Sequence, residues 1–108
     1  MSWDIWLAVE VDGKEVEIAD GEGYTHNCNN MVRAAGFVEW PYEVDGMTSR
    51  EFCEKLDAAL QALRANPAWF RRMNPENGWG DYDGLVRILD RVLDSFDRFP
   101  SATVRVSA

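Results

Sequence analysis

Residues 3–18, WDIWLAVEVDGKEVEI, decide the fold of this chain. In the first half of the stretch, apolar side chains occupy every second position: Trp3, Ile5, Leu7, Val9 and Val11. This period of two is typical of a β-strand with one buried face. The dipeptide Asp12-Gly13 favours a tight turn with positive φ, and the alternation resumes from Lys14 to Ile18. The stretch therefore predicts a β-hairpin.

The segments that follow the hairpin predict a loop, a short helix and a second loop. Residues 19–23 are acidic and contain two glycines, so we expect a loop there. Met31 and the alanines after it indicate a short helix, which Gly36 ends. A further loop is expected over residues 38–47, which contain a proline and a glycine.

Three further helices and a strand complete the prediction. Thr48 and Glu51 form a capping box at the start of a long helix, and Pro67 suits the first turn of a short helix that continues to Met73. Asp81 caps the last helix, and Pro100 stops it. Its apolar stripe recurs at helical spacing: Tyr82, Leu85, Val86, Leu89, Val92, Leu93, Phe96 and Phe99. Residues 102–107 read as a strand that must pair with the hairpin to be stable.

This order of elements predicts an α+β fold. We expect one domain, residues 1–108, in which three to four helices pack on one face of a small antiparallel sheet made of the N-terminal hairpin and the C-terminal strand. The last strand is a candidate open edge, so both a monomer and a homodimer are compatible with the pattern.

The charge of the chain limits its partners. There are 19 acidic residues against 11 basic ones, a net charge of −8. Such a balance opposes nucleic-acid binding, because phosphates would be repelled. It permits a basic protein partner, although the simplest interpretation is solubility.

The location is predicted from what the N-terminus and the apolar runs lack. We find no basic segment followed by an apolar run, and no apolar stretch near the roughly 20 residues that span a bilayer. We therefore expect no membrane association and a cytoplasmic location, with Cys28 and Cys53 reduced. His26 and Cys28 are too few ligands for a zinc site, so we expect no metal and no cofactor.

Two polar clusters stand at predicted helix starts, where unpaired backbone N–H groups favour anions. If the fold brings them together, they form a polar pocket walled by Trp79 and Tyr82. The candidate ligand-binding residues are Tyr24, Thr25, His26, Asn27 and Asn30 in the first cluster, and Asn74, Glu76, Asn77, Trp79 and Tyr82 in the second. The competing interpretation is that these side chains cap helices and hold turns.

Catalysis has little support in the sequence. His26 lies two residues from Cys28, a spacing that rarely places an imidazole against a thiol, and no oxyanion-hole signature follows. A hydrolase using Cys28, Glu76 or Asp81 ranks last among our hypotheses, and we assign no catalytic residue.

The five tryptophans are many for so small a core. Since tryptophan is enriched at interfaces, one or two of them are expected at a contact surface. Trp6 and Trp40 are our candidates for an exposed partner surface, and partial burial under the long loop is the alternative.

Three segments carry a family resemblance: Tyr24 to Asn27, leading into Met31 and Ala34; Met73 to Tyr82, with the run NPENGWG; and the ending from Phe99 to Ser107. In these segments the chain resembles an uncharacterised family of small proteins from actinobacteria and their phages. The resemblance covers nearly the whole chain. It implies an origin and an architecture, but no reaction.

These observations lead to two hypotheses of function. The first is a small acidic accessory protein of phage or prophage type that binds a host protein without catalysis, in the cytoplasm of the bacterial host. The second is a module that binds a polar metabolite or a nucleotide between the two asparagine-rich loops.

Overall fold

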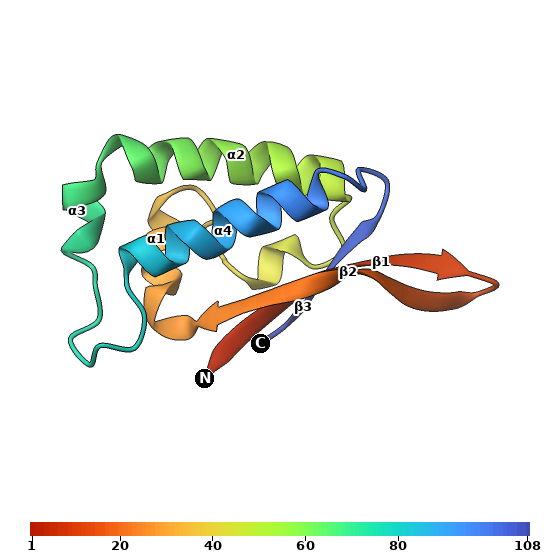
Figure 1. Ribbon diagram of the computed structural model, residues 1–108, viewed down its shortest axis with the longest axis horizontal. Coiled ribbons are helices and arrows are strands. Elements are labelled where there is room, and N and C mark those ends of the chain that lie inside the picture. Colours follow the sequence, from red (N-terminus) through yellow and green to blue (C-terminus); the bar gives the residue numbers. More distant parts are fainter.

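The computed structural model describes the backbone of residues 1–108 and every side chain except that of Asp20. Its helices and strands follow the predicted order (Figure 1). They are β1 (Ser2–Val11), β2 (Lys14–Thr25), the 3₁₀ turn η1 (His26–Cys28), α1 (Asn29–Ala34), the 3₁₀ turn η2 (Tyr42–Val44), α2 (Ser49–Ala65), α3 (Pro67–Arg71), α4 (Tyr82–Phe96) and β3 (Thr103–Ser107).

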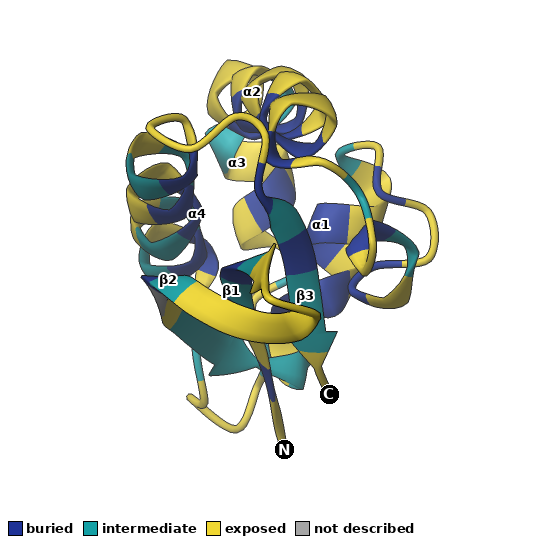
Figure 2. Cartoon of the chain, turned by 90° about the vertical axis from the view of Figure 1, so that its right-hand side faces the viewer, coloured by how far each residue is buried: buried dark blue, intermediate teal, exposed yellow. Residues whose placement is uncertain are grey.

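The three strands form an antiparallel sheet in the order β2-β1-β3, and the helices lie on one face of it (Figure 2). The predicted α+β fold is therefore confirmed. Asp12 and Gly13 both have positive φ, 52° and 76°, as the two-residue turn between β1 and β2 requires. None of the described helices is long and apolar enough to cross a membrane.

The second strand is longer than we predicted, because residues 19–23 continue β2 and do not form a loop. Two irregularities in the register, between Ile5 and Leu7 and between Leu7 and Ala8, accommodate extra residues in β2. The two glycines allow close approach to β1: a Cβ at Gly21 would lie 2.8 Å from the carbonyl oxygen of Ile5. Both glycines are therefore strand residues rather than loop residues: Gly21 lies in a bulge, and Gly23 pairs in regular register with Asp4.

The outer edge of β3 is closed, contrary to our expectation of an open edge. The segment 45–48 runs along it, with the N–H of Gly46 donating to the carbonyl of Val104 at 2.8 Å and the N–H of Val104 donating to the carbonyl of Met47 at 2.8 Å. The carboxylate of Asp45 accepts from the N–H of Val106 at 3.0 Å. A second copy therefore finds no free ladder at β3.

The core lies between the sheet and the helices. The sheet contributes Trp3, Ile5, Leu7 and Val104, α2 contributes Phe52, Leu56, Leu60 and Leu63, and α4 contributes Leu85, Leu89, Val92 and Phe96. Trp40, which we expected on an exposed partner surface, belongs to this core, with 0% of its surface accessible. Its ring meets Trp3 edge-on at 5.1 Å between centroids and packs against Phe37 at 5.3 Å. The loop that carries it thus closes the core, and Trp40 cannot contact a partner.

Candidate functional site

The two predicted polar clusters lie side by side at one end of the molecule. The hydroxyl of Tyr24, at the end of β2, accepts a hydrogen bond from the backbone N–H of Asp81 at 3.0 Å. The side-chain amide of Asn27 donates to the carbonyl of Trp79 at 3.4 Å. The fold therefore brings the two clusters together, as a joint site requires.

Contact between the clusters requires Gly80. A Cβ at this position would collide with the Cγ2 atom of Thr25 and would lie 3.2 Å from the ring of Tyr24 and 3.3 Å from the sulfur of Cys28. Its φ is +87°, which L side chains rarely adopt. The loop from residue 73 to 81 therefore approaches η1 through a glycine backbone.

Most polar side chains of the two clusters bind backbone groups. Thr25 caps η1 by accepting from the N–H of Asn27, and Asn30 accepts from the N–H of Met31. Asn74 accepts from the N–H of Tyr82 at 2.8 Å. These bonds are those of turns and helix starts, as the capping interpretation predicts.

Tyr82 does not wall a pocket between the clusters. Its ring is buried and stacks with Phe70 at 6.3 Å, and its hydroxyl donates to the carbonyl of Leu63 at 2.7 Å. Arg71 covers the ring at 5.1 Å and pairs with Asp83 at 2.8 Å. These contacts fix α3 to the beginning of α4.

Trp79 is the exposed residue at the centre of this arrangement, with 71% of its surface accessible. Both of its backbone polar groups are held by asparagines. Asn27 donates to its carbonyl, and Asn77 accepts from its N–H at 3.0 Å. The two asparagine-rich loops therefore fix the backbone of a residue whose indole ring faces solvent.

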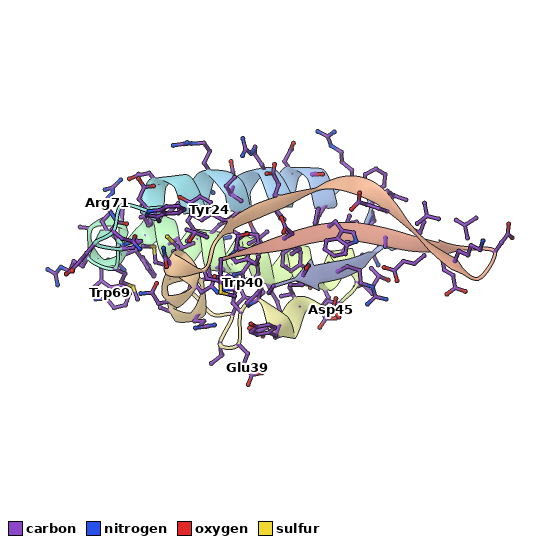
Figure 3. All side chains as sticks on the ribbon, turned by 90° about the horizontal axis from the view of Figure 1, so that it is seen from below. Tyr24, Glu39, Trp40, Asp45, Trp69 and Arg71 are labelled. Carbon is purple, nitrogen blue, oxygen red and sulfur yellow. The ribbon has the colours of Figure 1, made fainter. Side chains whose placement is uncertain are left out.

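A second exposed tryptophan, Trp69, lies at the same end (Figure 3). Its ring meets the buried ring of Phe70 edge-on at 4.9 Å, so one edge is packed while 51% of its surface stays accessible. A hollow of about 380 Å³ beside it is lined by Ala62, Ala65, Asn66, Trp69 and Phe70. No local sequence signal distinguishes the exposed Trp69 and Trp79 from Trp6 and Trp40, because the exposure of a tryptophan depends on tertiary packing.

The side chains of the remaining candidates take no part in the hydrogen bonds between the two clusters among the described residues. Glu76 is exposed in the loop, whereas the Nε2 atom of His26 is buried and has no hydrogen-bond partner within the described residues. Trp6 is half-buried on the outer face of the sheet, opposite Arg105 in β3. In the part of the chain that the structure describes, no three potential metal-ligating side chains form a cluster.

Cys28 lies beneath the contact between the clusters. Burial raises the pKa of its thiol to about 11, and the nearby Asp81 carboxylate adds to the shift. At neutral pH the thiol is therefore protonated, the less nucleophilic form.

Comparisons with protein-family models, curated proteins and solved structures found no match.

Proposed function

We propose that this chain is a small accessory protein of phage or prophage type that acts by binding a host protein, without catalysis. The observation that carries the proposal is Trp79, whose indole ring is exposed while its backbone is held on both sides by Asn27 and Asn77. A protein–protein interface commonly depends on a few aromatic anchors, and an anchor held in place in the free protein loses less entropy on binding.

We include in the proposed binding surface Trp69, which is also exposed and lies at the same end of the molecule. The short helix α3 that carries it is fixed to α4 by the Arg71–Asp83 ion pair and by the stacking of Phe70 on Tyr82. The hollow beside Trp69 offers a place for an apolar side chain of the partner. We name the surface formed by Trp69 and Trp79 the tryptophan surface.

The proposal is tested by affinity capture from a lysate of an actinobacterial host. The baits are the wild-type chain, Trp69→Ala/Trp79→Ala, and the control Tyr42→Phe, which removes only the hydroxyl of an exposed tyrosine elsewhere on the surface. A protein captured by wild type and control is then purified and its affinity measured. We expect Trp79→Ala to weaken binding at least about thirtyfold, as for an interface hot spot (about 2 kcal/mol or more).

Asn77→Ala provides a second readout in the same assay. It keeps both indole rings in the chain but removes the hydrogen bond that the N–H of Trp79 donates to the side chain of Asn77. If Asn77 positions the anchor, its variant weakens binding while the chain remains folded. Equal capture by the wild type and by a folded Trp69→Ala/Trp79→Ala chain would contradict the proposal.

The alternative, binding of a polar metabolite or nucleotide between the loops, has a separate test. A ligand at a hundredfold its dissociation constant stabilises a domain by about 2.7 kcal/mol, which a thermal-shift panel detects. A ligand that stabilises wild type but not a folded Asn27→Ala chain would favour the metabolite hypothesis over protein binding.

A further inference from the structure

The β-hairpin projects from the body of the molecule at the end opposite the tryptophan surface (Figure 1). Pairing of β1 with β3 ends at Ala8 and Thr103, so residues 9–18 continue as a two-stranded arm. Val11 and Val16 on this arm are 50% and 42% exposed. Two strands alone bury little, and the arm therefore has surface available for a partner.

One edge of the arm is an open ladder. Strand β2 is at the end of the sheet order β2-β1-β3, and its first residues pair with β1 in regular register from Lys14 to Glu17. In an antiparallel ladder the backbone groups point alternately toward the partner and away from it. Since the Val11–Lys14 pair closes the two-residue turn, the backbone groups of Glu15 and Glu17 point outward.

The bulges confine this open ladder to the arm. Both register irregularities lie nearer the body, where Ile5, Leu7 and Ala8 pair with β2. Bulges interrupt pairing at a sheet edge and protect it from association. The regular segment from Lys14 to Glu17 lacks that protection.

The side chains along this edge have a defined chemistry. Val16 lies on the same face as its cross-strand partner Val9, whereas Glu15 and Glu17 lie on the opposite face. Residues 9–18 contain four acidic side chains and one basic one. Arg105 pairs with Glu15 at 3.0 Å, but Glu17 is exposed and has no ion-pair partner among the described side chains.

We propose that the open edge of the arm, Lys14 to Glu17, binds an extended basic segment of another protein as an additional strand. Apolar side chains of the segment would lie over Val16, and lysine or arginine side chains would face Glu15 and Glu17. A second copy of this chain fits less well, because pairing two such edges brings their glutamates together and like charges opposite one another destabilise a sheet. This inference does not depend on the tryptophan surface.

The test uses a fluorescent ten-residue peptide of alternating lysine and valine. Fluorescence anisotropy measures the affinity of the peptide for the full chain. Changes in the amide chemical shifts of the chain show which residues the peptide contacts. The controls are a peptide of the same composition with its five lysines and five valines in separate blocks, and a peptide of alternating glutamate and valine. We expect only the alternating lysine peptide to bind, with the largest shifts at Glu15 and Glu17.

Two variants separate charge from backbone pairing. Glu17→Gln removes one charge. Glu17→Pro removes the same charge and the outward N–H, a change that an edge strand tolerates. We expect Glu17→Pro to bind the alternating peptide about tenfold more weakly than Glu17→Gln, the effect of one lost hydrogen bond. Amide chemical shifts of the Glu17→Pro variant that match those of the wild type outside the arm would show that the variant is folded.

Three results would overturn the inference. These are equal affinity for the alternating and the block peptide, shifts centred on the acidic faces of α2 and α4, and equal binding by Glu17→Pro and Glu17→Gln. Sedimentation of the free chain provides a fourth such result. If the wild type is a dimer and the Glu17→Pro variant is a monomer, the edge binds a second copy of this chain and not a basic segment of another protein.

Discussion

The hydroxyl of Tyr24 accepts a hydrogen bond from the backbone N–H of Asp81 at 3.0 Å, although the two residues are 57 positions apart in the sequence. The same oxygen lies 3.4 Å from the carbonyl oxygen of Asp81 and donates to it. One side chain at the end of the hairpin thus satisfies both backbone groups of the residue that caps α4. Asp81 in turn accepts from the N–H of Gly84 at 2.7 Å, so the hairpin and the helix start form one connected unit.

Removing this hydroxyl should weaken the connection. We expect Tyr24→Phe to lower the free energy of unfolding by about 1 kcal/mol, the net value of a typical hydrogen bond. Urea denaturation measures the change. Tyr42→Phe is the matched control, since Tyr42 is exposed, and it should change stability by less than about 0.5 kcal/mol. Equal effects of the two substitutions would show that the bond contributes nothing.

Two glycines of the same loop should respond differently to alanine. Gly78 and Gly80 both have positive φ, 74° and 87°, so each substitution carries a backbone strain of about 1 kcal/mol. A Cβ at Gly78 meets nothing within 4 Å, whereas one at Gly80 collides with Thr25. We expect Gly80→Ala to destabilise by about 1–3 kcal/mol more than Gly78→Ala. Similar losses for both would mean that the loop moves away without cost.

The tryptophans of the core and of the tryptophan surface should separate stability from binding. Trp40 is fully buried, so Trp40→Ala is expected to cost about 3–5 kcal/mol of unfolding free energy. Trp79→Ala removes an exposed ring and should cost less than about 1 kcal/mol. Thermal and urea denaturation give both values. A large loss with Trp79→Ala would make this residue a packing element and would weaken the proposed function.

The buried thiol of Cys28 predicts a dependence of stability on alkaline pH. Its pKa is raised to about 11 in the folded chain, whereas an unfolded cysteine titrates near about 8.5. Between these values the folded state binds more protons than the unfolded state, so the free energy of unfolding falls as pH rises. The slope from this one group is at most about 1.4 kcal/mol per pH unit.

Urea denaturation from about pH 8 to about pH 10.5 tests this dependence. We expect Cys28→Ala to lower stability at every pH, because it leaves a cavity, and to make the alkaline slope shallower. Burial also raises the pKa of Cys53, so part of the alkaline slope remains in that variant. Parallel curves for wild type and Cys28→Ala would show that Cys28 titrates normally.

The parts of the fold that the sequence predicted are those that local chemistry determines. The Asp12-Gly13 turn, the Thr48 cap that accepts from the N–H of Glu51, and the Asp81 cap were each recognisable within a few residues. The apolar stripe of α4 was equally clear, although Phe99 lies beyond the helix and is exposed. In these places one local signal agreed with the tertiary structure.

The errors arose where distant segments decide the outcome. Gly21 resembles a loop residue until β1 lies beside it, and Trp40 resembles a surface residue until its loop folds over Trp3. The closure of β3 by Gly46 and Met47 has no periodic signal at all. For the candidate site, the sequence identified the two loops, but it could not show that Asn27 and Asn77 hold Trp79.

The position of β1 in the centre of the sheet has a consequence for how the chain acquires its structure. One neighbour, β2, follows it after a two-residue turn, but the other, β3, is almost the whole chain away. A hairpin forms within microseconds, whereas pairing such distant segments requires closing a very long loop, which slows folding. As the chain leaves the ribosome, all the helices are made before β3 is. Until then, the edge of β1 that β3 will cover stays open, and in this interval the growing chain is most exposed to misassociation.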